Sequence, residues 1–496
     1  MGKIKKTKIT SFDAAECGAF GDVLSKAADS QRVTVGLLGL GYFEYWRMYP
    51  RLQEIVRQDL DGVFKRLTAS LGSVKVIYPG MVDTLDRAEA AGAEFAAASV
   101  EIVLVFEGTY IPDFITLHAL NRVGPHAKVI LVNTQTGPDL CPTDNYMATM
   151  RNSALIGISQ LTGSFRKMKR DYDVVSGEIG DPAVYREIRT LVQAHAAVRQ
   201  LRTCTYGLIG HVFRGMYDLE FDAAKVKGFL GPEVMTIQAE HLIELWQAVE
   251  DRDVDRAAKA LFARFRHKKI TLDDVKRSCR LGLAMKKLKH KFNLDGLCFL
   301  GQHYIEKMTG APARMGASMM LEDDHTMVAC EGDIAGLVMM QLLHAFTGNR
   351  PFQAEWGQFD RQHNALFLLG HGIGSPEMAG DDRQVTLTCS PEEWGFKGNG
   401  LNYEMIMKPG LVTMGHFLNV GDSWRMLISE GEAIEFPCLP CDEIHAMIKV
   451  ASPVEDYLRQ VLKQGVAHHL IVAHGQVAGE LEKTADLMKV ENFIIK

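Results

Sequence analysis

The chain has 496 residues, 47% hydrophobic and 23% charged, and its 55 Lys and Arg against 61 Asp and Glu give a formal net charge of −6. This composition excludes a disordered chain, a collagen-like fibre and a coiled-coil rod, and the acidic balance does not favour a dedicated nucleic-acid binder. No apolar run approaches the roughly 20 residues that span a bilayer, so we expect no membrane partner.

Short apolar runs that alternate with helical patterns predict an N-terminal α/β domain over residues 1–175. Near-continuous Val, Ile and Leu is typical of parallel strands that are buried on both sheet faces, and the alternation with helices predicts a doubly wound arrangement. The predicted strands are Val33–Leu40, Val74–Tyr78, Val100–Phe106 and Lys128–Val132, and the clearest helices are Tyr49–Leu71 and Thr84–Ala98.

A glycine-rich turn follows the first predicted strand. The dinucleotide-binding pattern requires Gly-x-Gly-x-x-Gly, but after Gly39 and Gly41 position 44 is Glu. A glycine-rich turn also serves any tight strand exit. We therefore expect no nicotinamide cofactor.

A second doubly wound α/β domain is expected over residues 176–335. Asp181 and Pro182 are a good N-cap and first-turn pair for its first helix. Further helices are expected around 239–264 and 271–291, and Thr271 and Asp274 have the spacing of a capping box. The predicted strands are Thr205–Ile209, Val234–Ile237 and Gly296–Leu300.

The pattern changes after about residue 335, and residues 336–496 are expected to form a β-rich, antiparallel, barrel-like domain with a terminal helix. Closely spaced β-prone runs favour antiparallel pairing. Ser452 and Glu455 have capping-box spacing at the start of that helix, which should end near Gly465. The predicted strands are Ala365–Leu369, Gln384–Cys389, Asn402–Met407, Leu411–Phe417, Trp424–Glu430 and Ala433–Phe436.

The nine cysteines are an odd number and do not resemble a disulfide framework, so we expect a reducing, cytoplasmic setting. Cys438 and Cys441 enclose Leu-Pro. This pair is compatible with a redox pair, with half of a zinc site or with a turn that carries two free thiols. No second pair follows, which favours the turn.

Residues 264–291 are strongly basic. They could form a phosphate-binding face. Because the whole chain has a negative net charge, a solvated helix face or a subunit contact is favoured.

Histidines and carboxylates gather beside glycines in the C-terminal half. Glu331 and Asp333 lie in Cys-Glu-Gly-Asp, Glu355 follows, and His371 and the pair His468-His469 come later. A metal ion that polarises a substrate oxygen needs a few carboxylate or imidazole ligands and open positions. These residues are of the right types, but spacing alone cannot bring them together.

The same residues carry a resemblance to the L-arabinose isomerase and L-fucose isomerase superfamily, closer to the arabinose isomerase branch. Glu331-Gly332-Asp333, the isolated Glu355, Gly370-His371 and Gly465-x-Ala467-His468-His469 occur in the family's order. The resemblance implies two α/β domains followed by a β-rich domain, interconversion of an aldose and a ketose, and a homo-oligomer with active sites between subunits. It also implies Mn2+ or another divalent cation held by Glu331, Glu355, His371 and His469.

The segments that reach the sugar in that family differ here. A Gln-His-Leu-Tyr type segment appears as Gly41-Tyr42-Phe43-Glu44, and a His-Thr-Phe segment appears as Gly108-Thr109-Tyr110. Gln135 matches the family, and Gln135, Asp333 and His468 are the candidate substrate-binding residues. The resemblance therefore favours the reaction class over arabinose itself.

Glu331 and Glu355 are the candidate catalytic residues, which would combine metal ligation with acid–base work. Two alternatives remain open. A non-catalytic sugar-binding or regulatory protein could use the same fold, and metal content would distinguish it. An oxidoreductase that uses the glycine-rich turn would need to bind a nucleotide.

Overall fold

The computed structural model describes residues 33–137, 140, 145–299, 302–323, 325–392 and 400–495, and the chain divides into two compact units, Met1–Ala196 and Ala197–Lys496. Parallel strands and helices occur in both units, so the expected α/β class is confirmed. The barrel-like form of the C-terminal strands stays a prediction. Within the described ranges, no helix has the length and apolarity needed to cross a bilayer.

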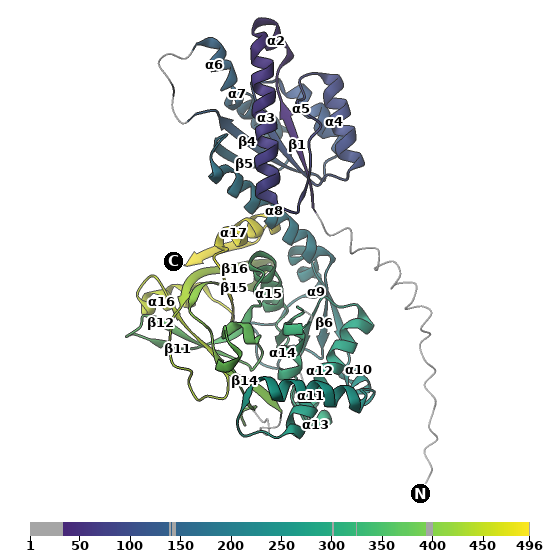
Figure 1. The fold of residues 1–496 in the computed structure, drawn as a ribbon, viewed down its shortest axis with the longest axis vertical. Helices are drawn as coiled ribbons and strands as arrows, with labels where there is room; N and C mark the ends of the chain where they lie inside the picture. The colour runs from purple at the N-terminus through teal and green to yellow at the C-terminus, as the bar shows by residue number, and fades with distance from the viewer. Residues whose placement is uncertain are drawn as a thin grey trace, which may run out of the picture. The chain divides into compact units, whose positions relative to one another are not determined.

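The first unit contains a five-stranded parallel sheet in the order β2-β1-β3-β4-β5 (Figure 1). Its central strands are buried on both faces, because α3 packs on one side and α4, α5 and α7 pack on the other. The elements are β1 Thr34–Leu40, α2 Phe43–Met48, α3 Pro50–Leu71, β2 Lys75–Ile77, α4 Leu85–Ala97, β3 Ile102–Glu107, α5 Asp113–Val123, β4 Lys128–Gln135, α6 Tyr146–Arg151, α7 Ala154–Met168 and β5 Asp173–Glu178.

The four strands predicted for this region are confirmed, with two differences. Strand β4 continues to Gln135, three residues beyond its predicted end at Val132. Strand β5 was not predicted, because its sequence DVVSGE offers only two consecutive apolar residues. Strand β5 lies at the edge of the sheet, and half of its residues are exposed, so it does not need the continuous apolar run of a central strand.

Helix α8 Pro182–Thr203 begins in the first unit and ends in the second, which continues with a four-stranded parallel sheet in the order β10-β9-β6-β7. The elements are β6 Thr205–Ile209, α9 Ala223–Lys225, the π-helix η2 Val226–Leu230, β7 Glu233–Ile237, α10 Ala239–Gln247, α11 Asp251–Arg264, α12 Leu272–Phe292, β9 Gly296–Phe299, α13 Gln302–Thr309, α14 Arg314–Asp323, β10 Met327–Cys330 and α15 Ile334–Thr347. The predicted strand end at Leu300 lies outside the described residues.

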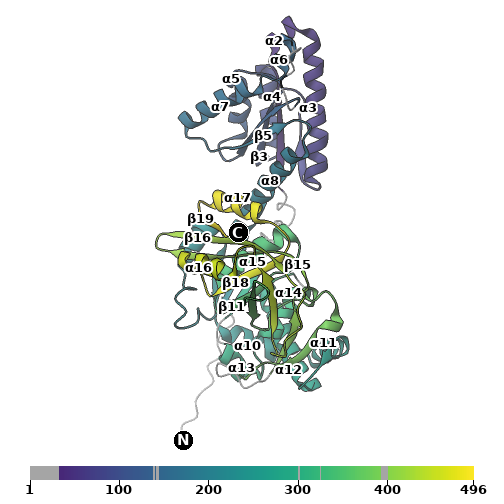
Figure 2. The ribbon, with the colours of Figure 1, turned by 90° about the vertical axis from the view of Figure 1, so that its left-hand side faces the viewer.

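A ten-stranded mixed sheet follows in the order β19-β16-β15-β18-β11-β12-β17-β14-β13-β8, and β16 also pairs with β17. Helix α15 packs against β15 and β18 (Figure 2). The elements are β8 Arg266–His267, β11 Phe352–Asp360, β12 Ala365–Gly370, η3 Pro376–Met378, η4 Asp382–Gln384, β13 Thr386–Cys389, β14 Leu401–Ile406, β15 Gly410–Val420, β16 Ser423–Ala433, β17 Ile444–Lys449, α16 Val454–Gln464, β18 His469–His474, α17 Ala478–Met488 and β19 Glu491–Ile495.

Three predictions for this unit are corrected. The helix expected over 239–264 is two helices, and the break is stabilised because Arg280 donates to the carbonyl of Val249 at 2.6 Å. The strand expected from Ala433 to Phe436 is absent, since Ala433 ends β16. The pairs β8–β13, β14–β17 and β16–β19 are parallel rather than antiparallel, because their partners come from distant parts of the chain.

The two predicted capping boxes have different outcomes. Thr271 and Asp274 form the expected box at the start of α12. No side chain of its own segment caps α16, and Asn364 accepts the N–H of Val454 at 2.8 Å instead. A distant residue therefore caps this helix start in place of the box expected from Ser452 and Glu455.

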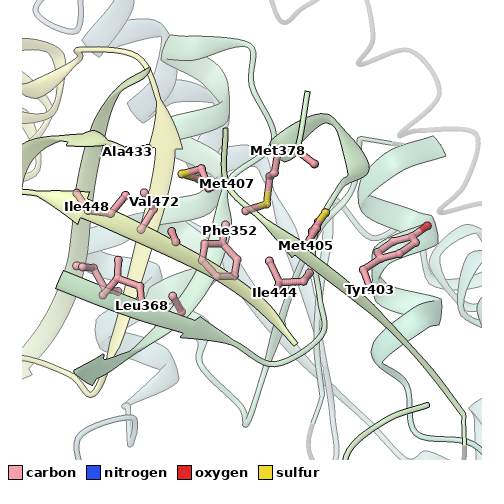
Figure 3. Packing of buried hydrophobic residues seen from close by; sticks show 14 of the residues in the cluster. Phe352, Leu368, Met378, Tyr403, Met405, Met407, Ala433, Ile444, Ile448 and Val472 are labelled. Carbon is pink, nitrogen blue, oxygen red and sulfur yellow. The ribbon is translucent and has the colours of Figure 1, made fainter. Parts of the chain in front are cut away.

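The largest hydrophobic cluster packs on one face of the ten-stranded sheet (Figure 3). Along β11, Phe352 and Ala354 are fully buried in this cluster. Because successive side chains of a strand point to opposite faces, Gln353 and Glu355 project from the other face. The packing of β11 therefore determines which side of the sheet receives these two polar side chains.

Candidate active site

Glu331 lies in a tight turn between β10 and α15. Its φ is 61°, in the left-handed region, and the next residue, Gly332, has a φ of 79°. A Cβ on Gly332 would lie 2.5 Å from the Cα of Val212, so glycine is required there. Asp333 then caps α15 by accepting the N–H of Gly336 at 2.7 Å. The turn therefore holds Glu331 directly after the end of β10, between this strand and α15.

Three neighbouring strands of the large sheet bring the other side chains to Glu331. Glu355 on β11 is the antiparallel partner of His469, the first residue of β18. His371 follows β12, whose last residue, Gly370, pairs with Ala354. Register alone thus places Glu355, His371 and His469 side by side.

The distances place the four side chains in two overlapping groups that share His469. His469 Nε2 lies 3.2 Å from Glu331 Oε2, and His371 Nε2 lies 3.1 Å from Glu355 Oε1. Possible ligand atoms of Cys330, Glu331, His371 and His469 all lie within 4.8 Å of one another, and those of Glu355, His468 and His469 form a second such group. The His469 side chain is fully buried and that of Glu355 is 39% exposed. The site therefore opens towards solvent on the Glu355 side.

A second group of buried polar side chains supports His469 from behind. Asp333 Oδ2 accepts a hydrogen bond from His469 Nδ1 at 2.9 Å, from His416 Nε2 at 2.9 Å and from Gln353 Nε2 at 3.1 Å. Gln353 in turn accepts the N–H of Cys330 at 2.9 Å. This arrangement holds the His469 ring with Nε2 directed at Glu331. Asp333 is fully buried, which favours an orienting role over contact with a substrate.

His468 faces a different carboxylate. Asp218, in the segment after β6, accepts both the backbone N–H of His468 at 3.0 Å and the ring Nδ1 at 2.6 Å. His468 Nε2 lies 3.5 Å from Glu331 Oε2. The ring therefore lies between Asp218 and the four-residue cluster.

The ionisation of the site follows from this pairing. Burial raises the pKa of Glu331, but the adjacent imidazoles of His468 and His469 outweigh burial and hold that pKa well below its usual value. The His371 imidazole beside Glu355 lowers the pKa of that carboxyl. Burial lowers the pKa of His469, but Asp333 and Glu331 outweigh it and raise the pKa to about 10. Both carboxylates are thus ionised at neutral pH and held among cationic or polar partners.

The donor set fits a divalent cation. The buried Nε2 atoms of His371 and His469 make no hydrogen bond in this structure, although each lies near a carboxylate oxygen. Buried imidazole nitrogens that face carboxylates without hydrogen bonds are what a metal cage presents when its ligands are aimed at a common ion. Two carboxylates and two imidazoles suit Mn2+ and other first-row divalent ions.

The structure places six of the seven predicted site residues together: Glu331, Asp333, Glu355, His371, His468 and His469. Gln135 ends β4 and belongs to the first unit, whereas the other six belong to the second. Sequence reasoning did not single out Asp218, Gln353 or His416. Each contacts the cluster through tertiary structure, and no local motif marks it.

The cysteine pair and the basic segment have structural explanations. Cys438 is exposed, Cys441 is half-buried, and both are free thiols in a turn where His445 Nε2 accepts the N–H of Leu439. Neither cysteine belongs to a metal-ligating group among the described residues. Cations of the basic segment are paired within the chain, as in Arg264–Asp382, Lys276–Asp255, Arg280–Asp251 and Lys286–Asp323.

A cavity of about 320 Å³ lies between α10, α11 and α12 and shares no residue with the cluster. Its cations are Lys276, Arg277 and Arg280, and each pairs with an aspartate. The cavity therefore offers no uncompensated charge for a ligand.

No family model matches the chain. Among known proteins, the sulfoquinovose isomerase of Alkalicoccus urumqiensis is similar, with 23% identity over 345 residues, which cover 68% of this chain and 75% of the relative. This similarity and the geometry of the cluster are independent observations, and the similarity supports a sugar isomerase function.

Proposed function

We propose that the protein is a metal-dependent aldose–ketose isomerase, an intramolecular oxidoreductase. The observation that supports this most is that Glu331, Glu355, His371 and His469, which come from separate elements, lie in two overlapping groups of possible ligands that share His469 and are joined by the contact of His371 with Glu355. The similarity to a sulfoquinovose isomerase adds support for the reaction class. Mn2+ is the proposed cofactor, in agreement with the donor set and with the family resemblance.

The reaction moves a hydrogen between C2 and C1 of the sugar and shifts the carbonyl from C1 to C2. A divalent cation held by the four side chains would supply the positive charge that stabilises the oxygens as they gain charge. Glu355 has the more exposed side chain, and it is the proposed base that removes the C2 proton and returns it to C1. Glu331, more buried and paired with His469, is proposed mainly as a ligand.

For the substrate we propose an aldose in its open form, with sulfoquinovose first among the candidates because the similar isomerase acts on it. Gln135 and His468 are the proposed substrate contacts. Gln135 lies in the first unit. From the family resemblance we also propose a homo-oligomer with active sites between subunits.

The test is turnover by purified protein that is first stripped with a chelator and then supplied with Mn2+. Sulfoquinovose, L-arabinose and L-fucose are each incubated with the protein, and ketose formation is measured. We expect ketose from at least one sugar with Mn2+ and none after chelation. Glu355→Gln should remove turnover while sugar still binds, and it should weaken Mn2+ binding because one carboxylate ligand loses its charge. Turnover that persists after complete chelation would overturn metal dependence, and sugar binding without turnover would favour a non-catalytic sugar-binding protein.

A further inference from the structure

We propose that Asp218 is a positioning residue of the isomerase, which fixes the His468 ring so that Nε2 faces the reaction volume and exchanges protons with the sugar oxygens. The proposal rests on the proposed function and adds a residue that neither the sequence motifs nor the similar isomerase identifies. It starts from the two hydrogen bonds that one oxygen, Asp218 Oδ2, accepts from His468.

The two hydrogen bonds determine the orientation of the ring. The contact to Nδ1 is 2.6 Å long, as short as charge-assisted hydrogen bonds, and the contact to the backbone N–H is 3.0 Å long. A ring that donates from Nδ1 while its own backbone donates to the same oxygen has no freedom to turn away. Nε2 is therefore held towards Glu331, at 3.5 Å from Oε2.

The segment that carries Asp218 is itself attached to the site. Phe213 donates its backbone N–H to the carbonyl of Glu331 at 3.2 Å, and Val212 packs against Gly332. Leu219, Val212 and Ala467 form a small hydrophobic cluster, which joins this segment to the strand start that carries His468. The segment that carries Asp218 is thus attached both to the turn of Glu331 and to the chain just before His468.

The reaction needs a proton carrier of this kind besides a base at carbon. When an aldose becomes a ketose, the C2–H and O2–H bonds break and the C1–H and O1–H bonds form. With Glu355 moving the carbon-bound proton, His468 Nε2–H gives its proton to O1 and regains one from O2. Atoms and electrons balance without another reactant. A ring held in place performs this exchange faster than one that must first rotate.

The chain offers a matched control. Asp360 accepts the backbone N–H of His363 at Oδ1, at 2.9 Å, and its ring Nδ1 at Oδ2, at 3.0 Å, so it binds the same two donors of a histidine as Asp218 does, but through two oxygens instead of one. Asp360 ends β11, five residues from Glu355 and about 16 Å from it at the rise of a strand. Asp360→Asn therefore tests the motif away from the site.

The experiment compares Asp218→Ala, Asp218→Asn and Asp360→Asn as Mn2+-loaded full-length proteins. We expect Asp218→Ala to lower kcat about 10–100-fold while KM and the Mn2+ dissociation constant change less than about threefold. Asp218→Asn keeps an oxygen acceptor and should restore part of kcat. Asp360→Asn should match the wild type. An Asp218→Ala variant with wild-type kcat would overturn the proposal, and so would one whose Mn2+ affinity falls in parallel with kcat, because Asp218 would then support a metal ligand.

A second readout does not depend on turnover. In Mg2+-loaded protein labelled with 15N-histidine, the His468 ring N–H bonded to Asp218 should exchange slowly with solvent. This signal should be absent from His468→Gln and Asp218→Ala and present in Asp360→Asn. If the signal behaves so but no sugar is turned over, the proposed function fails and the orientation by Asp218 stands. If the signal is unaffected by Asp218→Ala, the orientation fails whatever the activity.

Discussion

Asp333 Oδ2 lies 2.9 Å from His469 Nδ1, and this hydrogen bond directs the other ring nitrogen of His469 to within 3.2 Å of Glu331. The carboxylate is fully buried and accepts from His416 and Gln353 as well. A carboxylate behind a ligating imidazole fixes its tautomer and raises its basicity. Asp333, two residues from Glu331, therefore acts on the site through His469 and not through contact with a substrate.

Asp333→Asn tests this relationship through metal affinity. The amide cannot accept three donors at one oxygen, so the His469 ring should lose its fixed tautomer. We expect the Mn2+ dissociation constant, measured by titration calorimetry, to rise about 10–100-fold. Asp360→Asn is the control and should bind Mn2+ as the wild type does. An unchanged affinity in Asp333→Asn would contradict the orienting role.

The backbone at Glu331 leads to a prediction about stability. A residue with a side chain at φ 61° is strained by about 1–2 kcal/mol relative to the right-handed region, and glycine is not. Strain of this kind gathers at functional sites. Glu331→Gly and Glu331→Ala both remove the carboxylate, so both should lose Mn2+ binding and turnover.

The two variants should differ in the free energy of unfolding. We expect metal-free Glu331→Gly to be more stable than Glu331→Ala by about 1 kcal/mol, after the larger unfolded-state entropy of glycine is subtracted from the relieved strain. Urea denaturation of the metal-free proteins measures the difference. Equal stability would mean that the turn relaxes when the carboxylate is removed.

Local sequence patterns are sufficient to predict some elements of this fold and not others. Strand β1 was predicted because its apolar run requires burial on both faces, and the box of Thr271 and Asp274 because both partners lie within one turn of chain. The cap of Val454 by Asn364 could not be predicted from the sequence, because 90 residues separate donor and acceptor. Local chemistry shows that a donor needs a partner but not which distant residue supplies it.

The residues of the site likewise fall into those that the sequence indicates and those that only the fold shows. The residues Glu331, Glu355, His371 and His469 were singled out by their types and by their order in the chain. Their meeting depends on the register of β11 with β18 and with β12, which no spacing shows. Asp218, Gln353 and His416 sit in segments without a motif, so only the fold connects them to the site.

The capping box of α12 gives a stability prediction far from the site. Thr271 Oγ1 accepts the N–H of Asp274, and the Asp274 carboxylate accepts the N–H of Thr271 at 2.7 Å. Thr271→Ala leaves one helix donor without its acceptor and should lower the free energy of unfolding by about 1 kcal/mol. Urea denaturation checks this. Asp273→Ala, in the same first turn but outside the box, should cost less, and equal losses would contradict the role of the box.

Glu107 at the end of β3 gives a prediction about pH in the first unit. Its side chain is 4% exposed, Oε2 has no hydrogen-bond partner, and a Cβ at Gly157 would lie 1.8 Å from that oxygen. Burial, and secondarily the charge of Asp113, raise the pKa of Glu107 well above its usual value. The native state therefore keeps a proton that the unfolded chain has released above its own pKa near 4.5.

The sign of the pH dependence follows from this difference in bound protons. Between the unfolded and the folded pKa of Glu107 the native state binds more protons, so its stability falls as pH rises, by up to about 1.4 kcal/mol per pH unit. Glu107→Gln mimics the neutral acid and removes this contribution. We expect the variant to match the wild type near pH 5 and to exceed it in thermal stability at pH 8, measured by calorimetry of the first-unit transition. A variant that is equally or less stable than the wild type at pH 8 would show that Glu107 is ionised and accommodated in the native state.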